Sequence, residues 1–502
     1  MSVIVLATST VGAGMWAWVR VEEPNYPGGI IFSDTATVIE GPPPDGVAYR
    51  HEVLAEPDVF VAQEALETTG ALSWQRQGAT GSGVKVAVFD VGWSGVGLDP
   101  SVWDGAQLHD CVSDRTCESP FDVYWPSDLA DQGAHGMACA EIVSRVAPEV
   151  DLHLVRVNGL TSFENAVDWA IREGVDVISM SMSFYNASFY DGTGPFRDWV
   201  DRLAANDVLL VTSAGNNARS HWSGPFVDPD GDGRMSFDGD SALWTYQEEG
   251  RATWYLNWSQ HERCGSTDLG LRVVDESSGA RVIVGQVDAL QESGADGCEP
   301  IERLRAYVPE DGWYRLEVFA NRGRLEGVEV DVLARKGQVY PHQPWGSITE
   351  PALHQSVMAV GAVRADGYLV NELEPYSSWG PTHGGLAKPN IVGPDALTSS
   401  VYGSKGFYGT SASTPVVAGL VALILSNDAQ QTPHDAARQL ERWAWSSQPS
   451  LGGADMGEGA GRARLPTRWN VGSGCGSDPS PIWLGLVFVF CVPRRAWPRS
   501  GG

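Results

Sequence analysis

Hydrophobic and polar residues follow two different rhythms along the chain. From Gly83, short apolar runs alternate with stretches in which apolar residues recur every three or four positions. The first kind predicts buried strands and the second amphipathic helices. Strands alternating with helices predict an α/β fold whose parallel sheet is covered on both faces. The expected strands are 84–90, 150–157, 175–183 and 208–216, and the expected helices are 136–148, 161–174 and 195–207.

The rhythm changes between residues 219 and 343, where no helical periodicity is found. Short β-branched and aromatic runs follow one another, separated by Gly, Asp, Asn and Ser, which is typical of an all-β sandwich. The α/β rhythm then resumes with an apolar run at 356–363 and a long helix of small residues at 413–428. We therefore expect an α/β domain in two parts, 61–218 and 344–468, interrupted by a β-sandwich domain at 219–343.

The two ends of the chain carry different signals. Residues 1–60 begin with an apolar stretch that lacks a basic segment, and we expect a signal, a leader or a short propeptide there. Residues 469–502 join a Cys/Gly cluster to a short apolar run and then to Arg494 and Arg495. This layout resembles the C-terminal sorting tags of some Gram-negative bacteria, although a membrane span needs ~20 apolar residues. Membrane attachment through the tail is one expectation, and a plain tail with an apolar patch is the other.

Charge and cysteine content exclude some classes of binding partner and one kind of metal site. The formal net charge of −29 argues against nucleic acid and anionic membrane surfaces. We expect a monomer that is secreted or lies on the outer surface of a bacterium. The chain has seven cysteines and no CxxC pair, so a structural zinc site built from cysteines is not expected. Cys111 with Cys117, and Cys264 with Cys298, are candidate disulfides, and separate buried thiols are the alternative.

A serine at the start of the long helix is the first candidate for chemistry. In the stretch GTSASTPVVAG, a Gly-Thr turn delivers Ser411 to a helix N-terminus. The positive field at that end favours negative charge that develops nearby. The plain alternative is that Ser411 caps the helix.

A serine nucleophile needs a base, and the base needs an orienting carboxylate. His135 lies at the entry of a predicted helix, and Asp90 lies at the carboxyl end of a predicted strand, where open parallel sheets place their active sites. Asn216 follows another strand and could donate an amide N–H to an oxyanion. Taken singly, Asp90 and Asn216 are equally explained as turn residues.

The combination of these residues is far more specific than any one of them. Asp, His, Asn and Ser occur in that order in the motifs VAVFDVG, HGMACAEIV, SAGN and GTSASTPVVAG, and the chain resembles the subtilisin-like serine proteases (subtilases). The resemblance covers about Glu64 to Asn217 and Pro344 to Leu465. It implies a subtilisin-like three-layer α/β fold and a serine endopeptidase that acts on proteins or peptides and needs no cofactor for its chemistry.

The resemblance also implies a role for each residue. Ser411 would attack the peptide carbonyl, His135 would transfer its proton, and Asp90 would orient His135. Asn216 and the backbone N–H of Ser411 would bind the oxyanion. Exposed edges of two strand ends would pair with an extended substrate; these are Ser181, Met182 and Ser183, and Ser213, Ala214 and Gly215.

Several positions depart from the family's pattern. Val91 replaces a hydroxyl residue after the aspartate, Met137-Ala138 replaces Thr-His, and Glu141 and Ser183 each replace a glycine. These changes put rate and specificity in doubt more than reaction type. Two rival functions stay open: a catalytically silent adhesin or binding protein that uses the β insert, and an esterase-type acyl hydrolase. The intact catalytic positions argue against the first, and the absence of a G-x-S-x-G motif argues against the second.

Cys139 follows His135 by one helical turn. A zinc pair, a Cys/His nucleophilic couple and ordinary helix packing are the three interpretations. Some subtilases, the proteinase-K-like ones, carry a cysteine at this offset. Because Ser411 already has a full set of partners, we expect a buried, non-catalytic thiol beneath the base.

The stretch DPDGDGRMSFDGD suggests a cation. Asp228, Asp230 and Asp232 alternate, and Met235 stands where a calcium loop keeps an apolar residue, as in the first half of an EF-hand loop. The final ligand position holds Gly239 instead of glutamate. A structural calcium ion is expected here, with an acidic turn as the alternative.

Overall fold

The computed structural model describes most of the region from residue 61 to residue 467. The described ranges are 61–93, 105–121, 133–260, 267–289, 300–446 and 456–467, together with the short strands β1 (Ile4–Leu6), β2 (Ala17–Val19) and β3 (Ile31–Ser33). The rest of the predicted leader at 1–60, the tail at 469–502 and both Cys264 and Cys298 lie outside the described residues.

A seven-stranded sheet forms the centre of the α/β region, as the sequence pattern predicts. Its strand order is β20-β19-β9-β7-β4-β6-β5, and every neighbouring pair is parallel. The inner strands are buried along nearly their whole length, as expected for a sheet covered on both faces. The strands are β4 (Lys85–Asp90), β5 (Gln107–Asp110), β6 (Asp151–Arg156), β7 (Val177–Met180), β9 (Leu209–Ser213), β19 (Met358–Arg364) and β20 (Ile391–Asp395).

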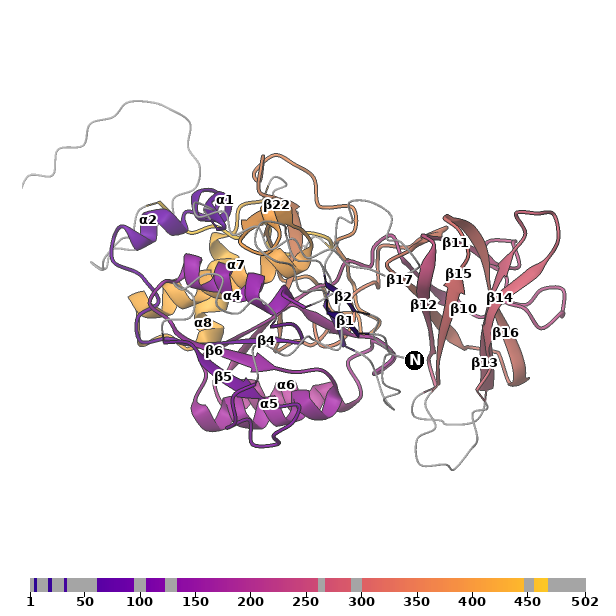
Figure 1. Ribbon diagram of the computed structural model, residues 1–502, viewed down its shortest axis with the longest axis horizontal. Helices are drawn as coiled ribbons and strands as arrows, with labels where there is room; N and C mark the ends of the chain where they lie inside the picture. Colours follow the sequence, from indigo (N-terminus) through magenta and orange to yellow (C-terminus); the bar gives the residue numbers. More distant parts are fainter. Residues whose placement is uncertain are drawn as a thin grey trace, which may run out of the picture. The chain divides into compact units, whose positions relative to one another are not determined.

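Helices cover both faces of this sheet (Figure 1). Helices α5 and α6 lie on one side, and α4, α7 and α8 lie on the other. Within the described ranges, α7 is the single helix long and apolar enough to cross a membrane, but it is 89% buried and is therefore the core helix of this layer. The helices are α1 (Gln63–Thr68), α2 (Ala71–Gln75), α4 (His135–Val146), α5 (Leu160–Glu173), α6 (Pro195–Ala205), α7 (Thr410–Asn427) and α8 (Pro433–Trp443).

Small residues let α7 pack closely against α4. A Cβ atom placed on Gly419 would lie 2.7 Å from the Cβ of Val146, which is closer than real side chains approach. This close approach accounts for the small-residue pattern that marks α7 in the sequence.

Two antiparallel sheets lie in the region between the two α/β parts. One has the order β10-β17-β12-β15 and the other the order β14-β13-β16-β11-β18. Trp254, Trp258 and Leu316 belong to the core that they share. The strands are β10 (His221–Pro225), β11 (Leu243–Gln247), β12 (Gly250–Trp258), β13 (Thr267–Asp275), β14 (Val282–Val287), β15 (Ile301–Val308), β16 (Gly312–Gly323), β17 (Glu329–Arg335) and β18 (Gln338–Tyr340).

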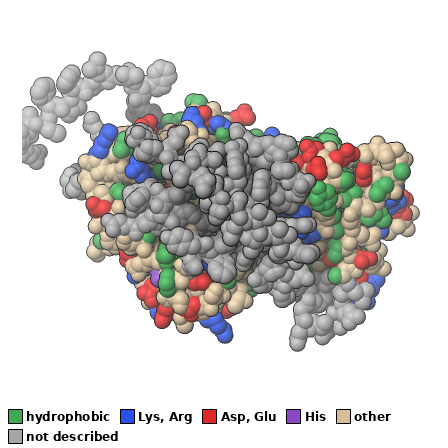
Figure 2. Space-filling view, in the orientation of Figure 1, with side chains coloured by type: hydrophobic (Ala, Val, Ile, Leu, Met, Phe, Trp, Pro, Cys, Tyr) green, Lys and Arg blue, Asp and Glu red, His purple; other side chains and the backbone are tan. Residues whose placement is uncertain are grey.

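Three short strands complete the described structure. Strand β8 (Met182–Phe184) pairs antiparallel with β3, and β21 (Leu397–Ser399) pairs with β22 (Gly403–Phe407). The predicted disulfide between Cys111 and Cys117 is confirmed. Acidic side chains are spread over the described surface in the view of Figure 2, as the net charge of −29 leads one to expect.

Candidate active site

The candidate catalytic residues lie at the ends of core elements. Asp90 is the last residue of β4, and Asn216 follows the end of β9. His135 is the first residue of α4, and Ser411 is the second residue of α7. The local contexts predicted for these four residues are therefore confirmed.

Asp90 and His135 form a fully buried pair. The Nδ1 atom of His135 lies 2.6 Å from Oδ2 of Asp90, and neither side chain is exposed. The other oxygen, Oδ1, accepts hydrogen bonds from the backbone N–H groups of Val91 (2.8 Å) and Gly92 (3.0 Å). Backbone donors thus satisfy the carboxylate without the hydroxyl that Val91 lacks. A Cβ on Gly136 would lie 2.7 Å from the Cβ of Asp90, so this close contact requires glycine.

The buried pair controls the protonation of the imidazole. Burial acts to lower the pKa of His135, but the adjacent Asp90 carboxylate and the Cys139 sulfur together outweigh burial and raise that pKa. With Nδ1 held by Asp90, any proton transfer falls to Nε2. That atom is buried and has no hydrogen-bond partner among the described residues.

Ser411 is not hydrogen-bonded to His135 in this structure. Its Oγ donates to the carbonyl oxygen of Ser181 at 3.4 Å, a long contact. Catalytic hydrogen bonds are often formed only when substrate is bound. The series Asp90–His135–Ser411 therefore remains a prediction for the substrate-bound state.

Two side chains hold the turn that precedes Ser411. The Oδ1 atom of Asn216 accepts hydrogen bonds from the N–H (3.0 Å) and the hydroxyl (3.1 Å) of Thr410. Any oxyanion donor role of Asn216 must therefore belong to its Nδ2. Asp395 accepts from the N–H of Gly409 at 3.0 Å. Asp395 is not identifiable from the sequence, because a lone aspartate at a strand end carries no distinctive signal.

Cys139 is a buried thiol beneath the base, as predicted. Its Sγ lies 4.0 Å from Nδ1 of His135 and 3.8 Å from the carbonyl oxygen of Ser411. Burial raises the pKa of Cys139, so the protonated form dominates at neutral pH. Because the nucleophilic form of cysteine is the thiolate, this environment argues against a Cys/His couple.

The expectation of exposed substrate edges is wrong for the described structure. All six residues are buried, namely Ser181, Met182, Ser183, Ser213, Ala214 and Gly215. Strand β9 runs between β7 and β19, and the N–H of Ala214 donates to the carbonyl oxygen of Val360 at 2.9 Å. Strand β8 carries β3 along its edge. The substrate-binding role of the six residues remains a prediction.

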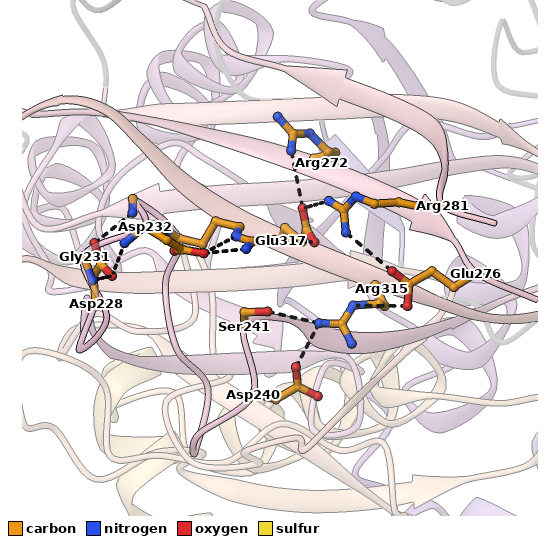
Figure 3. Close-up of polar contacts among 12 residues, drawn as sticks. Asp228, Gly231, Asp232, Asp240, Ser241, Arg272, Glu276, Arg281, Arg315 and Glu317 are labelled. Atoms are coloured by element: carbon orange, nitrogen blue, oxygen red, sulfur yellow. Dashed lines mark hydrogen bonds and ion pairs between the residues drawn. The ribbon is translucent and has the colours of Figure 1, made fainter. Parts of the chain in front are cut away.

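The acidic loop that contains Asp228, Asp230 and Asp232 forms a tight turn, and Arg234 supplies a positive charge within it (Figure 3). One oxygen from each of Asp228, Asp230 and Asp232 lies within 4.8 Å of the other two. Asp228 accepts hydrogen bonds from all three backbone N–H groups of residues 231–233, and Asp232 forms an ion pair with Arg234. A calcium ion would have to displace that ion pair. Calcium here remains a prediction, and no catalytic step depends on it.

Comparisons with known proteins identify relatives of this chain. Residues 81–256 and 335–462, more than half of the chain, match the sequence model of the subtilase family. The human membrane-bound transcription factor site-1 protease is 29% identical over 197 residues, which cover 36% of this chain and 17% of that protein. Subtilisin E of Bacillus subtilis (strain 168) is 29% identical over 159 residues, covering 29% of this chain and 37% of that protein. The chain thus matches well under half the length of these relatives.

One solved structure supports the fold alone. The CspB protease of Clostridium perfringens superposes with a TM-score of 0.52 at 15% sequence identity, covering 80% of this chain and 98% of that chain. At such low identity the likeness concerns the architecture and not the substrate.

Proposed function

The chain belongs to the subtilase family of serine peptidases, and on that premise we propose that it is an active endopeptidase that cleaves peptide bonds in protein substrates. The observation that carries this proposal is the 2.6 Å contact between Asp90 and His135, both fully buried, beside the turn that bears Ser411. A buried base with an orienting carboxylate is what activation of a serine hydroxyl requires.

The proposed chemistry proceeds in two stages. The Oγ of Ser411 turns from the carbonyl of Ser181, passes its proton to Nε2 of His135 and bonds to the substrate carbonyl carbon. The C–N bond then breaks as His135 returns the proton to the leaving amine. Water, deprotonated by the same Nε2, releases the acyl group from Ser411. Because only neutral His135 can accept the proton, we expect the rate to rise with pH through the pKa of His135.

Negative charge on the substrate oxygen would meet two donors. These are Nδ2 of Asn216 and the backbone N–H of Ser411 at the start of α7. Thr410 fixes the Asn216 amide through two hydrogen bonds. Fixed donors of this kind need no rearrangement during the reaction, and each contributes about 10²–10³ to the rate.

An extended substrate would bind by strand addition at β8. The antiparallel pairing of β3 with β8 supports this proposal, because there the edge of β8 is paired with an extended segment. A substrate would take the place of β3, so residues 31–33 would have to leave that edge. This fits a short propeptide and would limit activity before processing.

The location proposed for this peptidase is outside the cell. The acidic composition and the disulfide between Cys111 and Cys117 support a bacterial protein that is secreted or lies on the outer surface as a monomer. Attachment to a membrane would depend on residues 469–502.

A catalytically silent binding protein is the alternative, and labelling of Ser411 separates the two. A fluorophosphonate probe should label the folded full chain, and Ser411→Ala should abolish both labelling and peptide hydrolysis. Loss of the nucleophile from such a triad lowers kcat by about 10⁶-fold. Ser413→Ala, on the same helix, is the matched control and should label normally. If folded protein without residues 1–60 gives equal, background labelling with and without Ser411, the silent alternative stands.

A further inference from the structure

Three side chains from distant parts of the chain converge away from the candidate active site. His221 lies on β10, Asp331 on the neighbouring strand β17, and His383 in the segment between β19 and β20. The Nε2 atoms of His221 and His383 each lie 2.9 Å from the same oxygen, Oδ2 of Asp331. The side chains of His221 and Asp331 are 1% exposed, and that of His383 is 20% exposed.

The hydrogen bonds of His221 restrict where its protons can be. Its Nδ1 lies 2.8 Å from the carbonyl oxygen of Gln343, and a carbonyl can only accept, so Nδ1 carries a proton. In neutral His221 the lone pair of Nε2 then points at the carboxylate oxygen of Asp331. Two acceptors 2.9 Å apart repel each other. With Asp331 ionised, the contact is favourable only if His221 is a buried imidazolium or if a cation lies between the two atoms.

The donor set and its spacing match a transition-metal ion. Two imidazole nitrogens and one carboxylate oxygen are ligands that zinc prefers, and the three ligand atoms lie within 4.8 Å of one another. Ligands at about 2.1 Å from a tetrahedral zinc lie roughly 3.4 Å apart. The 2.9 Å contacts would have to open by only about 0.5 Å to admit the ion.

The surroundings orient His221 as a metal-binding histidine is oriented, and they pack the ring of His383 against an aromatic ring. A ligating histidine almost always donates its second N–H to a carbonyl or carboxylate, as His221 does to Gln343. The ring of His383 stacks on Phe189 with centroids 4.9 Å apart. Gly346 packs beside both histidines, since a Cβ there would lie 3.6 Å from Cε1 of each ring.

We propose that His221, Asp331 and His383 form a binding site for a divalent transition-metal ion, with zinc best suited to the donor set. Partial exposure at His383 leaves access for water as a fourth ligand. The ion would connect the four-stranded antiparallel sheet, through His221 and Asp331, to the peptidase segment that carries His383. The site is independent of the proposed catalytic machinery, and its expected effect is on stability.

Zinc binding by the full-length chain tests the proposal. The background carries Ser411→Ala, which prevents self-cleavage, and Cys139→Ser, because Cys139 clusters with Asp90 and His135 within 4.8 Å and could bind the metal itself. After removal of metal with a chelator, zinc titration by calorimetry and thermal unfolding should reveal a site that raises Tm. His383→Gln keeps a donor for Asp331 but is a poor metal ligand, and it should weaken this site by more than about 100-fold.

His342→Ala is the matched control, since His342 is exposed and belongs to no cluster of ligands. It should retain the zinc affinity and the rise in Tm. Cobalt bound to the same site should give visible d–d absorption without the near-ultraviolet charge-transfer bands of thiolate ligands, which separates this site from the remaining cysteines. Equal zinc affinity and equal rises in Tm for the background chain and His383→Gln would overturn the proposal. So would a failure of the background chain to bind zinc, and His221 would then be assigned as a buried imidazolium.

Discussion

Two buried carboxylates, one in each region of the molecule, have opposite kinds of partners. Asp90, at the end of the parallel sheet, contacts His135, and both side chains are fully buried. Glu317, on β16 of the antiparallel sheets, is equally buried but is surrounded by three arginines (Figure 3). Its oxygens lie 3.8, 3.5 and 2.5 Å from the guanidinium groups of Arg234, Arg272 and Arg281.

Asp90 and Glu317 differ in how far the charged groups of their partners are exposed to water. The side chains of Arg234, Arg272 and Arg281 are 36%, 24% and 39% exposed, so their charge is hydrated and permanent. His135 is enclosed and can lose its proton, so the energy of the Asp90 pair depends on protonation. A buried carboxylate can thus support catalysis when its partner is a buried titratable base. It contributes to the stability of the fold when its partners are partly exposed arginines.

Removing the charge of Asp90 tests the chemical side of this comparison and should have the largest effect. Asp90→Asn preserves size but cannot stabilise a protonated His135, and we expect kcat to fall by about 10⁴-fold with the fold intact. Peptide hydrolysis and thermal unfolding measure the two quantities. Glu276→Gln, which changes a 37% exposed carboxylate in the turn after β13, is the control and should leave kcat unchanged. A tenfold loss or less in Asp90→Asn would show that His135 does not need this partner.

The sequence anticipates the parallel sheet and the contexts of Asp90, His135 and Ser411 because local patterns determine both. Buried strands read as short apolar runs, and a residue at a strand end or helix start is visible in the sequence alone. Strands β10 and β18 have no such local signal. The sequence of β10 is HWSGP, where glycine and proline normally indicate a turn, and β18 has only three residues. Pairing with β17 and β11 stabilises these two strands, although their local sequences do not favour strand formation.

Relations between distant segments are likewise outside the reach of local patterns. The burial of Ser181 to Ser183 depends in part on pairing with residues 31–33, some 150 positions away in the sequence. The convergence of His221, Asp331 and His383 depends on the pairing of β10 with β17 and on the segment between β19 and β20. His221 and His383 belong to no short motif whose spacing would indicate a metal site in the sequence.

A third buried carboxylate, Asp395, extends the comparison to the pH dependence of stability. Burial raises the pKa of Asp395 to about 7, with Glu374 adding to the rise while the hydroxyl of Tyr376 and the charge of Arg364 oppose it. The ordinary value is 3.8, so between pH 4 and 7 the folded chain holds a proton that the unfolded chain releases. Asp395 therefore makes the folded state less stable as pH rises through this window.

Asp395→Asn should remove this loss because the amide stays neutral. Compared with the parent, the variant should gain stability from pH 4 to pH 8, and a shift of this size corresponds to roughly 4 kcal/mol. Denaturant unfolding in a Ser411→Ala background measures the difference at each pH, and subtraction removes the contributions of all other groups. A difference between variant and parent that is constant over this range would contradict the raised pKa.

The smallest effect is expected at Glu317, where the comparison predicts a loss of stability without a loss of chemistry. Glu317→Gln keeps the size of the side chain but removes the charge shared by three arginines. Because those arginines are partly hydrated, the cost should be about 1–3 kcal/mol, well below that of isolating a fully buried charge.

Glu326→Gln, which breaks a pair with Arg324 that is about four-fifths exposed, is the control and should cost almost nothing. Denaturant unfolding measures both variants, and kcat per folded molecule should be unchanged. Equal stability of the two variants would mean that the buried ion pairs of Glu317 contribute no more to stability than an exposed pair does. A large fall in kcat would mean that the antiparallel sheets and the candidate active site are coupled.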